Sequence, residues 1–207
     1  GQNVSVERTE KDIKFSYIMI GIVLVAILTL FITKYIFHTG WLPAIIAATL
    51  MIILAFFFAA ISGYLVGIIG SSNNPISGLT LTALVITALI LVSIGVGPEN
   101  GGVAAVLGVA AIVCVSAAVA GEMLQDLKAG HILGGTPWKM QVGDIIGVVV
   151  SGAVMFLILN MLNQADIAQG MVQGYDGGFG SSKLSAPQAG LMAMLSQGIV
   201  GGQMAWP

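Results

Sequence analysis

Residues 71 to 78 read SSNNPISG, and a long apolar run of residues 41 to 69 comes directly before them. Pro75 has no backbone N–H and disfavours a helical conformation at Asn74, the residue before it. Gly78 adds backbone freedom. We therefore predict that the helix formed by the apolar run ends or breaks at this polar stretch.

The composition around this break is typical of a membrane protein. The chain is 57% hydrophobic and 8% charged, whereas soluble domains have about 25% charged residues. A bilayer core of about 30 Å needs roughly 20 apolar residues in a helix. No run alternates in the manner of a barrel strand, so we predict an all-α, polytopic transmembrane helical bundle. Runs of sufficient length cover residues 15 to 37, 41 to 69, 76 to 96, 101 to 124 and 142 to 162.

These runs divide the chain into four parts. Residues 1 to 14 form an N-terminal arm, and residues 15 to 162 hold the five predicted helices of the bundle. Residues 163 to 186 contain QGYDGGFGSSKLSAPQ, which predicts a polar, flexible loop outside the membrane. Residues 187 to 207 contain LMAMLSQGIVGG, which we interpret as a partial sixth membrane segment, giving five to six spans. Because the chain begins at a glycine and stops within this segment, we expect it to be a piece of a longer protein.

Two interpretations of SSNNPISG stay open at this point. It forms either an interfacial loop in which Ser72 or Asn74 caps the next helix, or a discontinuous helix whose backbone and amides line a substrate cavity. The preceding run has 29 residues, which corresponds to about 43 Å of helix. This length exceeds the bilayer core and leaves room for a break inside the membrane.

A second polar stretch, residues 121 to 144, reads GEMLQDLKAGHILGGTPWKMQVGD. Glu122 and Asp126 are four residues apart and lie on one helix face. Ionisable groups at membrane depth are unfavourable, so both carboxylates are functional candidates. If Leu124 lies at the interface, Asp126 is solvated. Glu122, one turn deeper, then either extends to the headgroups or serves as a buried carboxylate that responds to protons or binds substrate.

Other functional classes find little support in the sequence. A net charge of −2 without a basic block argues against nucleic-acid binding. No His, Cys, Asp and Glu spacing suits a metal, and no phosphate-binding loop or supported catalytic triad occurs. Ser62, Ser93 and Ser116 have no nearby partner in the sequence that could activate them. We therefore predict neither an enzyme nor a cofactor.

Three stretches of the sequence resemble the oligopeptide transporter (OPT) family, which includes the yellow-stripe-like carriers. They are SSNNPISGLT, the whole of residues 121 to 144, and SAPQAGLMAMLSQGIVGG. The QDLKxGxxxGxTPWKxQ pattern is the most specific of the shared features, while the first two spans resemble the family only in character. The motif positions that carry over are Asn73, Asn74, Pro75, Gly78, Gln125, Asp126, Lys128, Gly130, Gly134, Thr136, Pro137, Trp138 and Lys139.

The resemblance implies a secondary active transporter, typically coupled to protons, that moves oligopeptides or peptide-like metal chelates. It favours the interpretation in which the polar break belongs to the transport pathway, with Glu122 or Asp126 coupling to protons. The expected partners are the lipid bilayer, the substrate and the remaining part of the same transporter. The alternative is a structural or assembly subunit of a membrane complex. The candidate substrate-binding residues are Ser71, Ser72, Asn73, Asn74, Pro75 and Gly78.

The distribution of basic residues predicts an orientation. With the N-terminal arm in the cytoplasm, the inner segments hold five basic residues and the outer segments hold Lys34 and Lys183, two in all. Cytoplasmic loops are enriched in Lys and Arg, so this count favours an N-terminus inside. The five inner residues are Arg8, Lys11, Lys14, Lys128 and Lys139. The resemblance is closest to prokaryotic members, which implies the inner (plasma) membrane.

Overall fold

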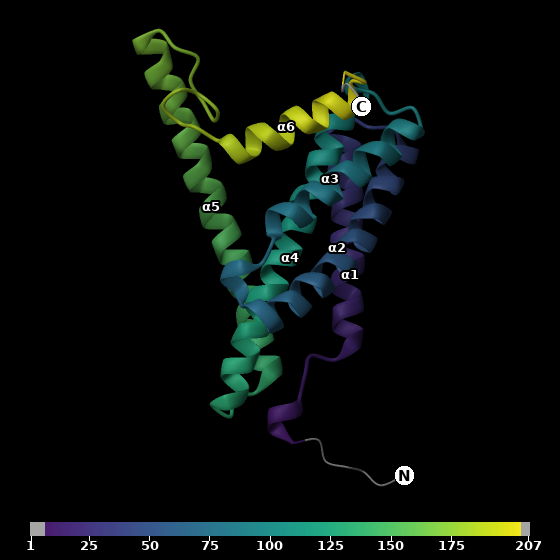
Figure 1. The fold of residues 1–207 in the computed structure, drawn as a ribbon, viewed down its shortest axis with the longest axis vertical. Helices are drawn as coiled ribbons and strands as arrows, with labels where there is room; N and C mark the ends of the chain where they lie inside the picture. The colour runs from purple at the N-terminus through teal and green to yellow at the C-terminus, as the bar shows by residue number, and fades with distance from the viewer. Residues whose placement is uncertain (1–6, 204–207) are drawn as a thin grey trace. The chain divides into compact units, whose positions relative to one another are not determined.

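The computed structural model describes residues 7 to 203. Residues 1 to 6 of the predicted arm and residues 204 to 207 of the predicted sixth segment therefore lie outside the described residues. Figure 1 shows that regular structure in the described part is helical. The α-helices are α1 (Phe15–Phe31), α2 (Trp41–Ile69), α3 (Ile76–Ser93), α4 (Gly102–Ile132), α5 (Pro137–Gln173) and α6 (Pro187–Val200). The prediction of an all-helical fold is confirmed.

Among residues 7 to 203, five helical segments are long and apolar enough to cross a membrane. They confirm the predicted number of complete spans. The α6 helix has 14 residues, or about 21 Å, which is short of the roughly 30 Å of a bilayer core. The five candidate spans are Arg8–Ile36, Trp41–Ile69, Ile76–Ser93, Gly102–Ile132 and Pro137–Gln173.

Two helices extend well beyond the apolar runs that predicted them. The α4 helix continues to Ile132, and α5 runs from Pro137 to Gln173, so the first part of the expected loop from residue 163 is helical. The physical reason is that Ala, Leu, Gln, Lys and Met have high intrinsic helix propensities, so a helix can continue past its apolar part. Hydropathy finds the part of a helix that suits lipid and misses its polar turns.

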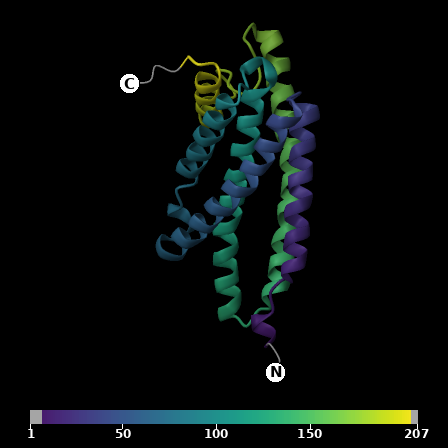
Figure 2. The same ribbon diagram turned by 90° about the vertical axis from the view of Figure 1, so that its right-hand side faces the viewer.

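The chain forms two compact units, which are described separately. The first comprises residues 7 to 141 with 193 to 203, and the second comprises residues 142 to 192. In the first unit, α2 and α4 run in the same direction (Figures 1 and 2). The α3 helix runs in the opposite direction, from the end of α2 back to the start of α4. Their contact surface contains small and branched residues, which let the helices approach closely. It includes Ala47, Met51, Leu54, Phe58, Ala83, Val109, Val113 and Ala117.

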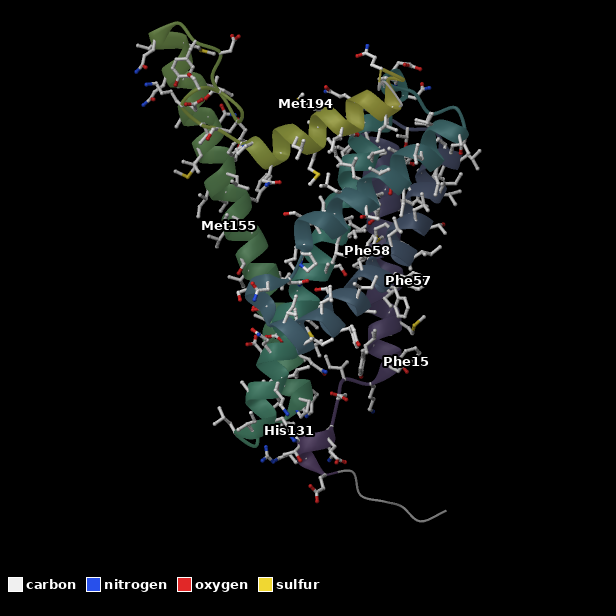
Figure 3. The ribbon with its side chains drawn as sticks, viewed as in Figure 1. Phe15, Phe57, Phe58, His131, Met155 and Met194 are labelled. Atoms are coloured by element: carbon white, nitrogen blue, oxygen red, sulfur yellow. The ribbon has the colours of Figure 1, made fainter. Side chains whose placement is uncertain are left out.

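Neighbouring phenylalanines on α2 illustrate how this surface is oriented. Phe58 is 8% exposed and belongs to the packed face, whereas Phe57 is 57% exposed on the outside of the chain. Figure 3 shows the two rings leaving the helix on different sides. At the end of the unit, α6 packs on the start of α4, where Ser196 Oγ donates to the Val103 carbonyl oxygen at 3.4 Å.

In the second unit, the glycine-rich loop after Gln173 folds back onto the C-terminal half of α5. Asp166 accepts hydrogen bonds from the Tyr175 hydroxyl (3.0 Å), the Gly178 backbone N–H (2.7 Å) and the Ser181 hydroxyl (2.7 Å). Burial and the bond to this carboxylate raise the pKa of Tyr175 above its ordinary value. The loop is thus held by specific bonds, in contrast to the flexible excursion that its composition indicated.

Candidate functional site: the polar break between α2 and α3

The SSNNPISG stretch forms a tight connection between two helices. Gly70 ends α2 with its N–H donating to the Val66 carbonyl at 3.0 Å, and its φ of 82° lies in the left-handed region that favours glycine. After a 3₁₀ turn at Ser71–Asn73, the Ile76 N–H donates to the Asn74 carbonyl at 2.8 Å. Pro75 stands between them at φ −79° and ψ 54°, the geometry of an inverse γ-turn. The chain therefore reverses within a few residues and enters α3.

This connection meets α4 partway along that helix. Val66 and Asn74 lie against Gly121, and α4 continues to Ile132, eleven residues further. Eleven helical residues extend about 16 Å. Both ribbon views show α2 and α3 meeting above the C-terminal end of α4 (Figures 1 and 2). The polar break is thus recessed from the C-terminal end of α4.

A chain of hydrogen bonds joins the break to α4. Ser62 Oγ, fully buried on α2, donates to the Ala117 carbonyl at 2.5 Å, and Asn74 Nδ2 donates to Ser62 Oγ at 2.6 Å. A carbonyl can only accept, so the single Ser62 proton points to Ala117 and the hydroxyl accepts from Asn74. This order fixes the orientation of the Asn74 amide. Its NH₂ group faces Ser62, and its oxygen faces away.

The oxygen of Asn74 is buried and has no hydrogen-bond partner among the described residues. An unsatisfied buried polar group costs about 1–3 kcal/mol relative to a paired one. Buried polar groups in proteins are nearly always paired, so each exception calls for an explanation. Asn74 Oδ1 is therefore an acceptor available to a group that the chain itself does not supply.

Close packing holds the amide at this position. A Cβ atom on Gly121 would lie 2.9 Å from Asn74 Nδ2 and 2.9 Å from Val66 Cγ2, closer than real Cβ contacts. One turn away, a Cβ on Gly63 would lie 2.6 Å from Leu124 Cδ1. Glycine at these two positions allows α2, the break and α4 to meet.

The remaining predicted substrate residues differ in exposure. Ser71 is half-buried, whereas Ser72, Asn73, Pro75 and Gly78 are exposed. The capping of α3 by Ser72 or Asn74, which was part of the interfacial-loop alternative, does not occur, because α3 has no side-chain cap. Instead, Asn73 Nδ2 donates to the Ile69 carbonyl at 3.1 Å and satisfies the end of α2. The physical reason is that the γ-turn at Pro75 already orders the start of α3.

Glu122 and Asp126 lie on α4 beside the break. Glu122 follows Gly121 directly, and Asp126 is one turn further along the helix. Both side chains are exposed on the surface of the chain. The structure therefore places one candidate carboxylate at the level of the recessed break and the other between the break and the polar end of α4.

The TPWK part of the second motif has a structural role. Arg8 donates to Thr136 Oγ1 and to the Gly134 carbonyl, each at 2.8 Å, and the Trp138 N–H donates to the Lys11 carbonyl at 2.9 Å. The N-terminal arm and the α4–α5 connection hence lie at the same end of the first unit. His131 marks this end in Figure 3.

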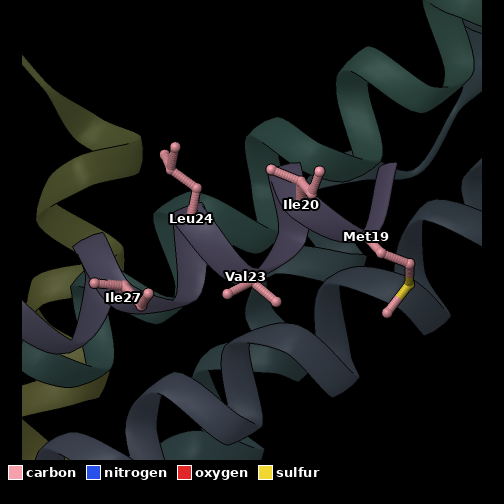
Figure 4. A pocket seen from close by; sticks show the side chains of 5 residues that line it. All are labelled: Met19, Ile20, Val23, Leu24 and Ile27. Atoms are coloured by element: carbon pink, nitrogen blue, oxygen red, sulfur yellow. The ribbon is translucent and has the colours of Figure 1, made fainter. Parts of the chain in front are cut away.

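A concave region occurs on α1 and differs in chemistry from the polar break. Figure 4 shows its lining side chains, which are Met19, Ile20, Val23, Leu24 and Ile27. All five are apolar, so this groove offers no hydrogen bond to a peptide. It suits a hydrocarbon surface, and the polar break is the better candidate for recognising a polar substrate.

Sequence reasoning missed Ser62, Ala117 and Gly121 as parts of the site. Ser62 was considered only as a nucleophile without a neighbour, yet its partners are Asn74, twelve residues later, and the Ala117 carbonyl, 55 residues later. One signal was present, since a hydroxyl within a long apolar run needs a partner when it is buried. No group of three acidic, histidine or cysteine side chains within the described residues could hold a metal ion.

Comparison with known proteins extends the resemblance to the whole chain. The family described as OPT oligopeptide transporter protein matches residues 2–207. A Haemophilus influenzae protein named "Putative oligopeptide transporter" is 34% identical over an alignment 221 residues long. The alignment covers 100% of this chain and 35% of that relative. No solved structure matches. The chain therefore belongs to the OPT oligopeptide transporter family.

Proposed function

We propose that this chain is part of a secondary active transporter that moves oligopeptides or peptide-like metal chelates across a membrane. The observation that carries the proposal is the recessed polar break, in which Asn74 presents a buried, unpaired oxygen beside α4. Family membership over residues 2–207 supports a transport role. The chain spans 35% of the relative's length, so transport is proposed for the full-length protein that contains it.

The break supplies neutral groups suited to a peptide backbone. Hydroxyls and amides bind polar groups without demanding a fixed charge, which fits zwitterionic peptides and chelates of varied composition. We assign substrate contacts to Ser71, Ser72, Asn73, Asn74, Pro75 and Gly78. Of these, Asn74 is joined to α4 through Ser62, whose hydroxyl donates to the Ala117 carbonyl.

Proton coupling is assigned to Glu122 or Asp126. A carboxylate on a membrane-spanning helix can take up and release a proton as its surroundings change. Glu122 is the stronger candidate because it adjoins Gly121, the residue against which Asn74 packs. The N-terminal arm is placed in the cytoplasm of a prokaryotic cell, with the chain in the inner membrane.

The test is uptake by the full-length protein in proteoliposomes under an imposed proton gradient. The substrates are a pooled library of short peptides and metal chelates, and the variants are Asn74→Ala and Glu122→Gln. We expect saturable, gradient-dependent uptake in the wild type and loss of uptake in Asn74→Ala with normal folding. Glu122→Gln should retain downhill flux and lose the response to the gradient. Ser93→Ala, at the other end of α3, is the control, because it removes a polar side chain away from the break.

A structural or assembly subunit is the competing function. In that case the full-length protein would show no saturable uptake and would be recovered in a stable complex with other proteins. Unchanged uptake in both Asn74→Ala and Glu122→Gln would mean that the protein is a transporter whose substrate and proton sites do not involve these two residues.

A further inference from the structure

We infer that Asn74 Oδ1 accepts a hydrogen bond from a nitrogen donor of the substrate and that Ser62 is the positioning residue that aims it. This inference rests on the proposed function and names the group that the site recognises. The donor is either a peptide N–H or the N-terminal ammonium, which present the same chemistry to a neutral oxygen.

The first step is the fixed direction of the amide. Ser62 Oγ lies 2.6 Å from Asn74 Nδ2 and gives its own proton to the Ala117 carbonyl. If the amide turned over, Asn74 Oδ1 would face a hydroxyl that has no proton left to donate. The bond between Ser62 and Ala117 therefore selects the orientation that leaves the oxygen available.

The second step is the chemistry of the available atom. A side-chain amide oxygen accepts and cannot donate, so it selects N–H groups and rejects carbonyl and carboxylate oxygens. Gly121 brings the backbone of α4 next to the amide nitrogen and helps to hold the amide in place. A peptide, with one N–H per residue and an ammonium at its start, carries such donors.

The third step is the burial of the oxygen in this conformation. A buried acceptor without a partner is unfavourable, and a substrate donor would pair with it in a conformation where movement of the break exposes the oxygen. A ligand shifts a conformational equilibrium only when it binds the two states differently. Pairing at Asn74 Oδ1 supplies such a difference and links substrate binding to movement of the break.

The test measures the KM and kcat of uptake by the full-length protein for trialanine and three analogues. Two are depsipeptides in which an ester oxygen replaces one peptide N–H, and the third is propionyl-dialanine, which lacks the terminal ammonium. In the wild type, one analogue should show a KM about tenfold above that of trialanine. The identity of that analogue tells whether an amide or the ammonium is the donor.

The variants decide whether Asn74 is the acceptor. In Asn74→Ala the KM ratio between that analogue and trialanine should fall close to one, because the partner is already absent. Ser62→Ala should raise the KM for trialanine with kcat unchanged and reduce the ratio to about threefold, since the amide can then rotate. Ser62→Thr, which keeps the hydroxyl, should restore the wild-type ratio. Should Asn74→Ala fail to fold, Ser62→Ala carries the comparison.

Equal ratios in the wild type, Asn74→Ala and Ser62→Ala would overturn the inference while leaving peptide transport intact. A wild type in which all three analogues match trialanine would overturn it as well. Absence of uptake for trialanine and for every member of the peptide library would instead remove the proposed function, and the inference with it.

Discussion

Two polar side chains, the buried Asp166 and the half-buried Asn74, differ in how completely they are hydrogen-bonded. Each anchors a glycine-containing polar segment to a long helix. Asp166 is 7% exposed and accepts three hydrogen bonds from the loop that follows α5. Asn74 donates one bond to Ser62, and its oxygen accepts none from the described residues. Asp166, whose carboxylate is fully hydrogen-bonded, orders the loop after α5, whereas the Asn74 oxygen can still accept a hydrogen bond from another molecule.

Only part of this contrast was visible in the sequence. The helical fold and its five spans follow from the lengths of the apolar runs, and α2 begins at Trp41 and ends at Ile69 as predicted. The turn at Pro75 follows from local chemistry. Local signals of this kind depend on residues that are close in the chain.

The rest depended on contacts between distant residues. Nothing near Asn74 in the sequence indicates that it bonds Ser62 or that Ser62 bonds Ala117, because the second of these contacts depends on the packing of α2 along α4. The glycines after α5 indicated flexibility, yet Asp166 gathers them into an ordered loop. Whether a polar residue is paired is a property of the folded chain.

The largest effect is expected from Asp166→Asn. The amide replaces a carboxylate with two accepting oxygens by a group with one, so at least one of three donors loses its partner. Bonds to charged groups are worth about 1.5–3 kcal/mol each, and we expect a loss of about 3 kcal/mol in the local stability of the loop. Hydrogen exchange at the Gly178 amide should then be faster by about 100-fold.

Asp176→Asn is the matched control for Asp166→Asn. It makes the same chemical change on an exposed side chain of the same loop. Exchange at Gly178 should stay near its wild-type rate. Equal acceleration by both substitutions would show that the Asp166 cluster does not hold the loop.

A smaller effect is expected where α4 meets the break. Gly121→Ala would place a Cβ 2.9 Å from both Asn74 Nδ2 and Val66 Cγ2, forcing the break away from the helix. Overpacking of this kind costs about 1–3 kcal/mol. Thermal unfolding of the full-length protein in detergent should occur at a lower temperature. The control is Gly67→Ala on α2, where a Cβ meets nothing within 4 Å; it should leave the midpoint unchanged or raise it slightly.

A smaller effect again is expected at the N-terminal arm, where the exposed Arg8 side chain is hydrogen-bonded to the α4–α5 connection. Arg8→Ala removes bonds to Thr136 and Gly134, and because Arg8 is exposed we expect a cost of about 1 kcal/mol. The amide of Trp138, which bonds Lys11, should exchange about fivefold faster. Glu10→Gln alters an exposed neighbour on the same arm and should leave that rate unchanged. An unchanged rate in Arg8→Ala would mean that the backbone bond alone holds the arm.

The smallest change in stability is expected at a second buried polar group without a hydrogen-bond partner. Thr87 on α3 is fully buried, and its hydroxyl has no hydrogen-bond partner among the described residues. Replacing an unpaired hydroxyl by a methyl group of similar shape is close to neutral or stabilising by up to about 1 kcal/mol. Thr87→Val should therefore unfold at the wild-type temperature or above it. A clear decrease would show that this hydroxyl has a bonding role in the full-length protein.

Peptide affinity in Asn74→Ala and Asp166→Asn, measured side by side in the full-length protein, tests the central contrast most directly. The measurement is the KM for trialanine uptake, normalised to folded protein, together with the midpoint of thermal unfolding. The unpaired amide predicts a KM raised about tenfold in Asn74→Ala with a nearly unchanged midpoint, and a wild-type KM in Asp166→Asn with a lowered midpoint. A wild-type KM in Asn74→Ala, accompanied by a large loss of stability, would contradict the account and make the break a purely structural joint.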